Sequence, residues 1–103
     1  MRKITQESVA AFFTAKPFNK SNMEVEVLAN VTIMKLFGNS IAFRYNDPQN
    51  TLSITNCGFK TNTTKERLNG VLDHIGHAGI CQRNFVWYLG GDVWDGELTD
   101  VVL

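Results

Sequence analysis

The residues best suited to metal chemistry lie close together in the second half of the chain. His74 and His77 are three positions apart, Cys81 follows them, and Asp73 precedes them. Zinc takes histidine and cysteine ligands in tetrahedral geometry, so a small metal-dependent enzyme is one alternative. However, His77 is expected beyond the end of a helix, and Cys57 belongs to a distant segment. We therefore predict no metal site, with His74 exposed and Cys81 a small core residue.

Other constellations typical of catalysis are weak. Cys81 beside His77 would need a third group to orient the base, and no flanking signature supplies one. Asp92 and Asp95 could form a carboxylate pair, but they occupy a glycine-rich segment where acids are normally solvated. The Gly90–Gly91 pair is not followed by the Lys-Ser/Thr of a phosphate-binding loop. We therefore predict no enzyme activity and no cofactor.

Aromatic and acidic residues near the end of the chain give the strongest indication of binding. Tryptophan and tyrosine are enriched at the energetic centres of protein interfaces. Trp87 is expected in the core, whereas Trp94 fits a core edge as well as a contact residue. No basic residue follows Arg83, so an acidic segment could meet a basic partner, although a solvated terminus has the same composition. The predicted partner-binding residues are Tyr88, Trp94, Asp92 and Asp95.

Nucleic-acid binding is an alternative that the charge balance favours less. Ten basic and ten acidic residues give a formal net charge of zero, whereas nucleic-acid binders usually carry a basic excess. Aromatic and basic residues do alternate at Phe43-Arg44-Tyr45 and Lys35-Leu36-Phe37, as on surfaces that stack single strands. The candidate residues for this alternative are Lys35, Arg44, Lys60, Lys65 and Arg67.

The first half of the chain has the pattern of a helix followed by an antiparallel meander. Thr5 is expected to cap a helix over residues 6–15, which must end before Pro17. Alternating apolar residues, separated by turn-forming pairs such as Gly38–Asn39, then predict strands. These strands are expected at residues 24–27, 31–37, 41–45 and 52–55.

The second half has the pattern of a helix and a hairpin. Thr63 and Glu66 have the spacing of a capping box, in which Thr63 caps the helix and Glu66 bonds back to its amide. Gly76 is the expected stop. Residues 79–83 and 85–89 are then expected to pair as a hairpin.

This order of elements predicts an α+β fold. We expect a helix, a four-stranded antiparallel meander, a second helix and a C-terminal β-hairpin, packed as one helix-on-sheet domain over residues 1–103. Two cysteines are too few for a disulfide framework, so both are expected to be buried thiols in a reducing compartment. No signal segment and no membrane-spanning apolar run is visible, so a cytoplasmic protein is expected.

Several longer motifs, each present once, are distributed along nearly the whole chain. They are Ile4-Thr5 at a helix start, the turn over residues 36–42, the helix start over residues 63–70, Trp87-Tyr88-Leu89 and Trp94-Asp95-Gly96. Together they resemble a group of small accessory proteins of tailed bacteriophages. The segment from His74 to Cys81 is longer here than in that group, whose pattern supplies no metal ligands there.

The resemblance implies a phage accessory protein, without enzyme activity or cofactor, made in the cytoplasm of an infected bacterium. Such a protein would bind a host or defence-system protein, in order to redirect it or to block it. Alternatively, a bacterial immune sensor would bind the phage protein as a sign of infection. Because the sequence contains no apolar run long enough to span a membrane, no membrane partner is expected, and the sequence does not indicate an oligomeric state.

Overall fold

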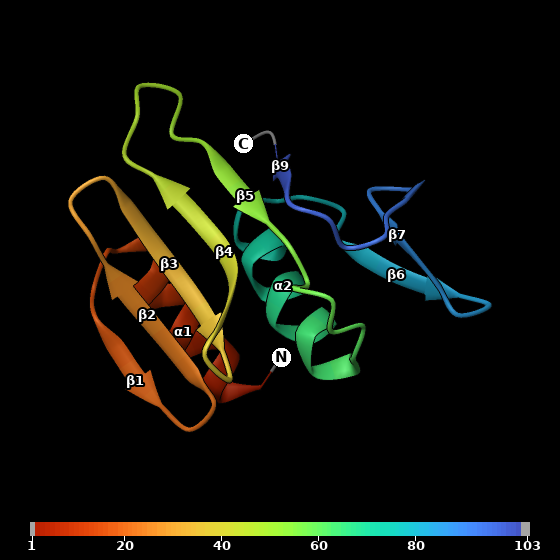
Figure 1. The fold of residues 1–103 in the computed structure, drawn as a ribbon, viewed down its shortest axis with the longest axis horizontal. Coiled ribbons are helices and arrows are strands. Elements are labelled where there is room, and N and C mark those ends of the chain that lie inside the picture. The colour runs from red at the N-terminus through yellow and green to blue at the C-terminus, as the bar shows by residue number, and fades with distance from the viewer. Residues whose placement is uncertain (1, 102–103) are drawn as a thin grey trace.

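The computed structural model describes residues 2–101, which contain two helices and nine strands (Figure 1). A large antiparallel sheet has the strand order β1-β2-β3-β4-β5-β9, and a small antiparallel sheet has the order β6-β7-β8. The strands of the large sheet are β1 Phe18–Lys20, β2 Met23–Val27, β3 Val31–Leu36, β4 Asn39–Tyr45, β5 Leu52–Ile54 and β9 Thr99–Val101. Those of the small sheet are β6 Ile80–Arg83, β7 Val86–Leu89 and β8 Asp92–Val93. The α+β class is confirmed, but the described residues form more strands than the predicted meander and hairpin.

The strands that the sequence does not predict are short. β1 pairs with β2, β8 extends the hairpin, and β9 pairs with β5 at an edge of the large sheet. Each has two or three residues, which is too few for alternation to be recognised. β9 has the largest consequence, because it returns the end of the described chain to the large sheet (Figure 1).

The first helix, α1, spans Lys3–Phe13 and begins earlier than predicted. Arg2 occupies the N-cap position without a side-chain hydrogen bond, so the prediction of Thr5 as the cap is wrong. Thr5 is instead buried within the helix. Its hydroxyl donates to Glu66 and accepts from Arg67, so it joins α1 to the second helix.

The second helix, α2, spans Asn62–His74. Its cap is Thr61, whose Oγ1 accepts a hydrogen bond from the Thr64 amide at 3.1 Å. The predicted cap at Thr63 is therefore wrong, and Glu66 does not close a capping box because its carboxylate bonds to α1. Within the described residues, no helix is long and apolar enough to cross a membrane.

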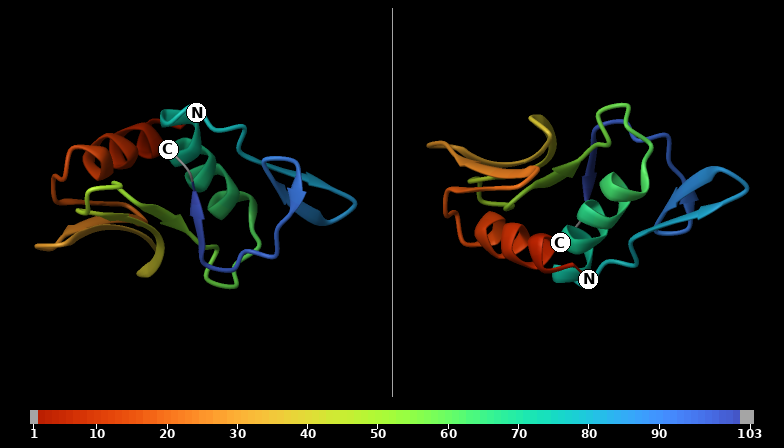
Figure 2. Two further views of the ribbon diagram at one scale, coloured as in Figure 1. Left: turned by 90° about the horizontal axis from the view of Figure 1, so that it is seen from above. Right: turned by 90° about the horizontal axis from the view of Figure 1, so that it is seen from below.

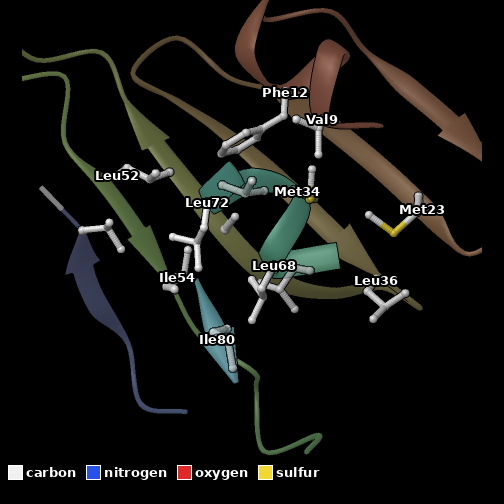
Figure 3. Packing of buried hydrophobic residues seen from close by; sticks show 14 of the residues in the cluster. Val9, Phe12, Met23, Met34, Leu36, Leu52, Ile54, Leu68, Leu72 and Ile80 are labelled. Carbon is white, nitrogen blue, oxygen red and sulfur yellow. The ribbon is translucent and has the colours of Figure 1, made fainter. Parts of the chain in front are cut away.

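The helices lie on one face of the large sheet, and the small sheet lies beside α2, on the side away from α1 (Figure 2). The core fills the space between these layers. In Figure 3, Val9 and Phe12 of α1 and Leu68 and Leu72 of α2 meet side chains from the strands. The small sheet contributes its buried residues to the same core, which include Ile80, Trp87 and, just after β8, Trp94.

A buried polar network holds the two helices and the β1–β2 turn together. Arg67 is 2% exposed, and its Nη1 donates to Thr5 Oγ1 at 2.9 Å and to the carboxylate of Glu66. Its Nη2 lies 3.4 Å from Asn22 Oδ1. A buried guanidinium is costly unless it is paired, so Glu66 is the residue that makes this arrangement stable.

Candidate partner-binding surfaces

The small sheet is a hairpin of β6 and β7 to which β8 adds an edge. Asn84 and Phe85 form its two-residue turn, and both have positive φ, of 50° and 66°. This is the backbone of a type I′ turn. The register pairs Tyr88 with Cys81 on one side and with Val93 on the other, so these side chains share one face. We call this the outer face, and it consists of Cys81, Arg83, Val86, Tyr88 and Val93.

The outer face is exposed and largely apolar. Val93 is 70% exposed and Val86 is 36% exposed, whereas Tyr88 is half-buried between them. The guanidinium of Arg83 lies 4.6 Å from the centre of the Tyr88 ring. A cation–π contact of this kind restrains the ring. The result is a restrained aromatic side chain beside two exposed aliphatic ones.

Trp87 and Trp94 lie on the opposite, buried side of the small sheet. They are 1% and 5% exposed, and their rings stack with centroids 6.2 Å apart. Trp94 Nε1 donates to Thr99 Oγ1 at 2.9 Å, which links the small sheet to β9. The core position of Trp87 is confirmed. Trp94, which is among the predicted contact residues although a core edge fits it equally well, is a core residue, because alternation past β8 turns it inward and Val93 outward.

Asp92 and Asp95 border the outer face rather than forming part of it. Asp92 pairs with Leu89, so it lies on the face opposite Tyr88, where it is exposed at the sheet edge. Asp95 is also exposed, and its Oδ1 accepts from the Glu97 amide at 3.0 Å. The predicted residues therefore do not form one cluster, because Asp92 lies at the β8 edge and Asp95 lies in the segment between β8 and β9.

A second candidate surface is an apolar pocket of about 420 Å³ between the β3–β4 turn and the start of α2. Leu36 and Ile41 are nearly inaccessible residues in its lining, at 4% and 1% exposure. Phe37 and Phe59 also line it and are 71% and 50% exposed. A β-bulge shifts the β3–β4 register and leaves Ile41 as the extra residue of β4, which accounts for its burial beside Ala42.

Sequence reasoning missed Val93 and Phe37 as surface residues. An inward Trp94 would have implied an outward Val93, but the strand is too short for the alternation to be visible. For Phe37, the informative signal is the glycine that follows it. A turn placed at Phe37–Gly38, rather than one residue later, would have put this phenylalanine at the tip of a hairpin.

The residues considered as possible metal ligands each make separate contacts. His74 stacks on Phe13, with ring centroids 4.1 Å apart, and His77 Nδ1 accepts from the Gly79 amide at 2.9 Å. Cys81 belongs to the outer face. Among residues 2–101, no group of three or more His, Cys, Asp or Glu side chains is arranged to hold a metal ion.

The cysteines differ from their predicted environment, because Cys57 and Cys81 are both exposed and unpaired within the described residues. Cys57 Sγ donates to the Ser40 carbonyl at 2.7 Å. Partial burial raises the pKa of the Cys57 thiol, so this side chain is less easily ionised than a free cysteine. The expectation of buried thiols is therefore wrong.

Three of the five residues predicted for nucleic-acid binding already contact other residues of the chain, and these contacts lie in different parts of the fold. Arg67 is in the core. Lys35 Nζ lies 2.9 Å from Glu26 Oε1, and this hydrogen bond raises the pKa of Lys35. Arg44 Nε donates to the Phe12 carbonyl of α1 at 3.2 Å. The predicted set therefore does not form one basic stripe.

The remaining pair, Lys60 and Lys65, lies near the start of α2. Lys60 Nζ donates to the Phe85 carbonyl at the hairpin tip, and Lys65 Nζ donates to Gln82 Oε1 at 3.1 Å. Both lysines therefore bridge α2 or its preceding loop to the small sheet.

The arrangement defines a small α+β protein with two helices on one face of an antiparallel sheet and a second sheet beside them. The family model described as Kyanoviridae Gp96 protein matches residues 1–100. The chain therefore belongs to this family of phage proteins, and the expected relationship to small phage proteins is confirmed at that level. No curated protein and no solved structure matches the chain significantly.

Proposed function

We propose that this phage protein acts without catalysis, by binding a protein of the infected host cell through the outer face of the small sheet. The observation that carries the proposal is the exposure of Val93 and Val86 around the restrained ring of Tyr88. Tyrosine next to exposed aliphatic side chains is typical of the centre of a protein interface. Ile80 and Trp87 of the small sheet, and Trp94 just after it, are buried in the core, and they hold this face in place before a partner arrives.

Charge supports a basic partner. Asp92 is exposed on β8, and Asp95 and Glu97 are exposed in the segment that follows it, whereas the nearest basic residue along the chain, Arg83, lies against the Tyr88 ring. Complementary charges at the rim of an interface accelerate association and select among partners. We therefore propose that the partner surface has an apolar centre with lysine or arginine beside it.

Binding of this kind in the host cytoplasm would have one of three consequences. The protein would redirect a host protein, block a defence protein, or be bound by an immune sensor as a sign of infection. All three use the same physical event, which is recognition of a preformed surface by another folded protein.

Affinity capture from lysate of infected host cells, followed by mass spectrometry, tests the proposal. The wild-type chain should retain a stoichiometric host protein, and Val93→Asp should lose it, because a carboxylate at the centre of the interface would be buried without a partner. Leu28→Asp is the matched control, since Leu28 is 48% exposed in the β2–β3 turn, away from the small sheet. Capture that is absent, or equal for both variants, would contradict the proposal.

A further inference from the structure

A short segment between α2 and β6 carries the chain from the second helix to the small sheet (Figure 1). In this segment, the backbone amide of His77 donates to the Leu72 carbonyl of α2 at 2.9 Å. The ring of the same residue contacts the start of the small sheet, where His77 Nδ1 accepts a hydrogen bond from the Gly79 amide at 2.9 Å. His77 therefore bonds to the helix through its backbone and to the small sheet through its ring.

The His77 ring also lies against the far end of β7. A Cβ built on Gly90, which follows β7, would lie 3.2 Å from His77 Cε1. The Gly90 amide in turn donates to the Gly79 carbonyl at 2.9 Å, and this bond closes the pairing of β6 with β7 at this end. The ring therefore touches both strands at the base of the hairpin, next to the turn that leads into β8.

The hydrogen bond from Gly79 requires the neutral form of the His77 ring. A neutral imidazole has one nitrogen that donates and one that accepts, so with Nδ1 accepting, the proton is on Nε2. An imidazolium carries a proton on both nitrogens and accepts no hydrogen bond. Protonation of His77 would therefore place two N–H groups against each other and break the bond to Gly79.

The charged and titratable groups around His77 come from α2 and from the small sheet. On α2, Asp73 is exposed and lines the same hollow as His77, whereas His74 stacks on an aromatic ring of α1. On the small sheet, the charged residues are Arg83, next to the hairpin tip, and Asp92 on β8. Asp73 thus offers an imidazolium a second position, away from Gly79.

We infer that His77 is a pH-sensitive latch, in which the neutral ring fixes the base of the small sheet and protonation of the ring releases that base. The release is local, because a second contact with α2 does not titrate. The side-chain amide of Asn69 exchanges hydrogen bonds of 2.6 and 3.0 Å with the Ile80 backbone. The part that loosens is therefore the β7–β8 turn with β8, which carries Val93 of the outer face.

The latch is a property of the free chain, and it stands without the proposed function. Its effect on binding rests on that function. If the outer face contacts a host protein, acid should weaken the contact, because Val93 is then held less firmly. The first measurement is therefore made on the chain alone.

NMR spectroscopy of the isotopically labelled full chain, from about pH 7.5 down to about pH 5.5, tests the latch. The Gly79 amide and the His77 ring nitrogens should follow one titration curve. At the acid end, the protection of the Gly79 and Gly90 amides from hydrogen exchange, corrected for the intrinsic rate, should fall about fivefold or more. The Ile80 amide, which Asn69 holds, should stay within about twofold of its protection at neutral pH.

Two variants of His77 reproduce the two states of the latch. Asparagine can accept from the Gly79 amide and does not titrate, so His77→Asn should keep this amide protected over the whole range. His77→Ala has no acceptor, so its Gly79 amide should be weakly protected at both ends of the range. His74→Asn is the matched control, and it should retain the wild-type pH dependence at Gly79.

Two results would overturn the latch. One is a Gly79 amide whose shift and protection stay constant while His77 titrates, and the other is a pH dependence that persists in His77→Asn. Capture of the host protein should weaken at acid pH in wild type but not in His77→Asn. Loss of the latch on the free chain leaves the proposed function intact, whereas a working latch without any captured protein counts against that function alone.

Discussion

Phe37 and Phe85 each lie at positive φ in a two-residue hairpin turn, Phe37 at its first position and Phe85 at its second. A side chain in the left-handed conformation costs about 1–2 kcal/mol relative to glycine. Neither side chain recovers this cost by burial, since they are 71% and 85% exposed. Burial in this chain therefore does not account for a phenylalanine at either position.

Replacing Phe85 with glycine should stabilise the protein. The change creates an Asn-Gly pair, which is the preferred sequence of a type I′ turn, and it gives up little buried surface. We expect the free energy of unfolding to rise by about 0.5–1 kcal/mol, measured by urea denaturation. A fall in the denaturation midpoint would show that the exposed ring contributes to the fold.

Glu66 makes stability depend on pH. Burial raises the pKa of its carboxyl, but hydrogen bonds from Thr5 and Arg67 lower it more, so the net pKa is below the usual value of 4.5. A group whose pKa is lower in the folded state adds stability above its unfolded pKa. That contribution is lost as pH falls from about 4.5 towards the folded pKa. The unfolding free energy should decrease over this interval.

The Glu66→Gln variant tests this assignment. Near neutral pH it leaves the buried charge of Arg67 without its counter-ion, so we expect a loss of about 3 kcal/mol. Below the interval, where wild-type Glu66 is itself protonated, the two proteins should become similar. Glu97→Gln, an exposed position, serves as the control. Parallel pH profiles for Glu66→Gln and wild type would refute the role of Glu66.

At the scale of single residues, burial is predicted correctly for Trp87 but wrongly for Cys57 and Cys81, and both capping hydrogen bonds are predicted wrongly. Trp87 in the core follows from alternation, and this prediction is confirmed. Thr5 and Thr63 both fit the N-cap rule, but neither is a cap. Thr5 bonds to residues more than sixty positions away, and Thr61 caps α2 in place of Thr63. Long-range hydrogen-bond partners leave no local pattern in the sequence. The sequence alone therefore could not exclude Thr5 or Thr63 as an N-cap.

At the scale of elements, the segment between β8 and β9 depends on a close approach of Gly96 to Asn56. Gly96 has φ 93°, and a Cβ built there would overlap the buried Asn56 amide. The Gly96 carbonyl accepts a hydrogen bond from the backbone N–H of Asn56 at 3.0 Å and another from Thr55 Oγ1 at 2.7 Å. This contact joins the end of the small sheet to the loop after β5.

A pair of glycine variants separates backbone strain from this contact. Gly91 has φ 95° and no heavy atom near a built Cβ, so Gly91→Ala should cost only the conformational penalty of about 1–2 kcal/mol. Gly96→Ala should cost about 1–3 kcal/mol more, because it also overpacks Asn56. Thermal denaturation measures both. Equal losses of stability in the two variants would show that the loop around Asn56 shifts to make room for the new methyl group without destabilising the protein.

The elements with strong periodicity could be predicted, and those defined by long-range pairing could not. The second helix, the hairpin and β2 to β5 all lie within a few residues of their predicted positions. The stop of α2 at Gly76, which has φ 76°, also agrees with prediction. β1 and β9 exist because neighbouring strands offer unpaired edges, which no local pattern records. The pocket was likewise hidden, since it requires the β3–β4 turn and α2 to be adjacent.

At the scale of the whole molecule, the two sheets share one core through Ile80, Trp87 and Trp94. We therefore expect one cooperative unfolding transition rather than separate loss of the small sheet. Both tryptophans lie in or next to the small sheet, so tryptophan fluorescence reports on it, while far-ultraviolet circular dichroism is dominated by the rest of the chain. The two urea curves should coincide. A fluorescence midpoint at lower urea would reveal a small sheet that unfolds independently.

The central claim is that the outer face of the small sheet touches a host protein during infection. Site-specific photo-crosslinking is the most direct measurement, with the reactive residue placed at Val93 or, for comparison, at Leu28. The account predicts one discrete crosslinked host protein from position 93 and none from position 28. No crosslink from position 93, or the same pattern from both positions, would contradict it.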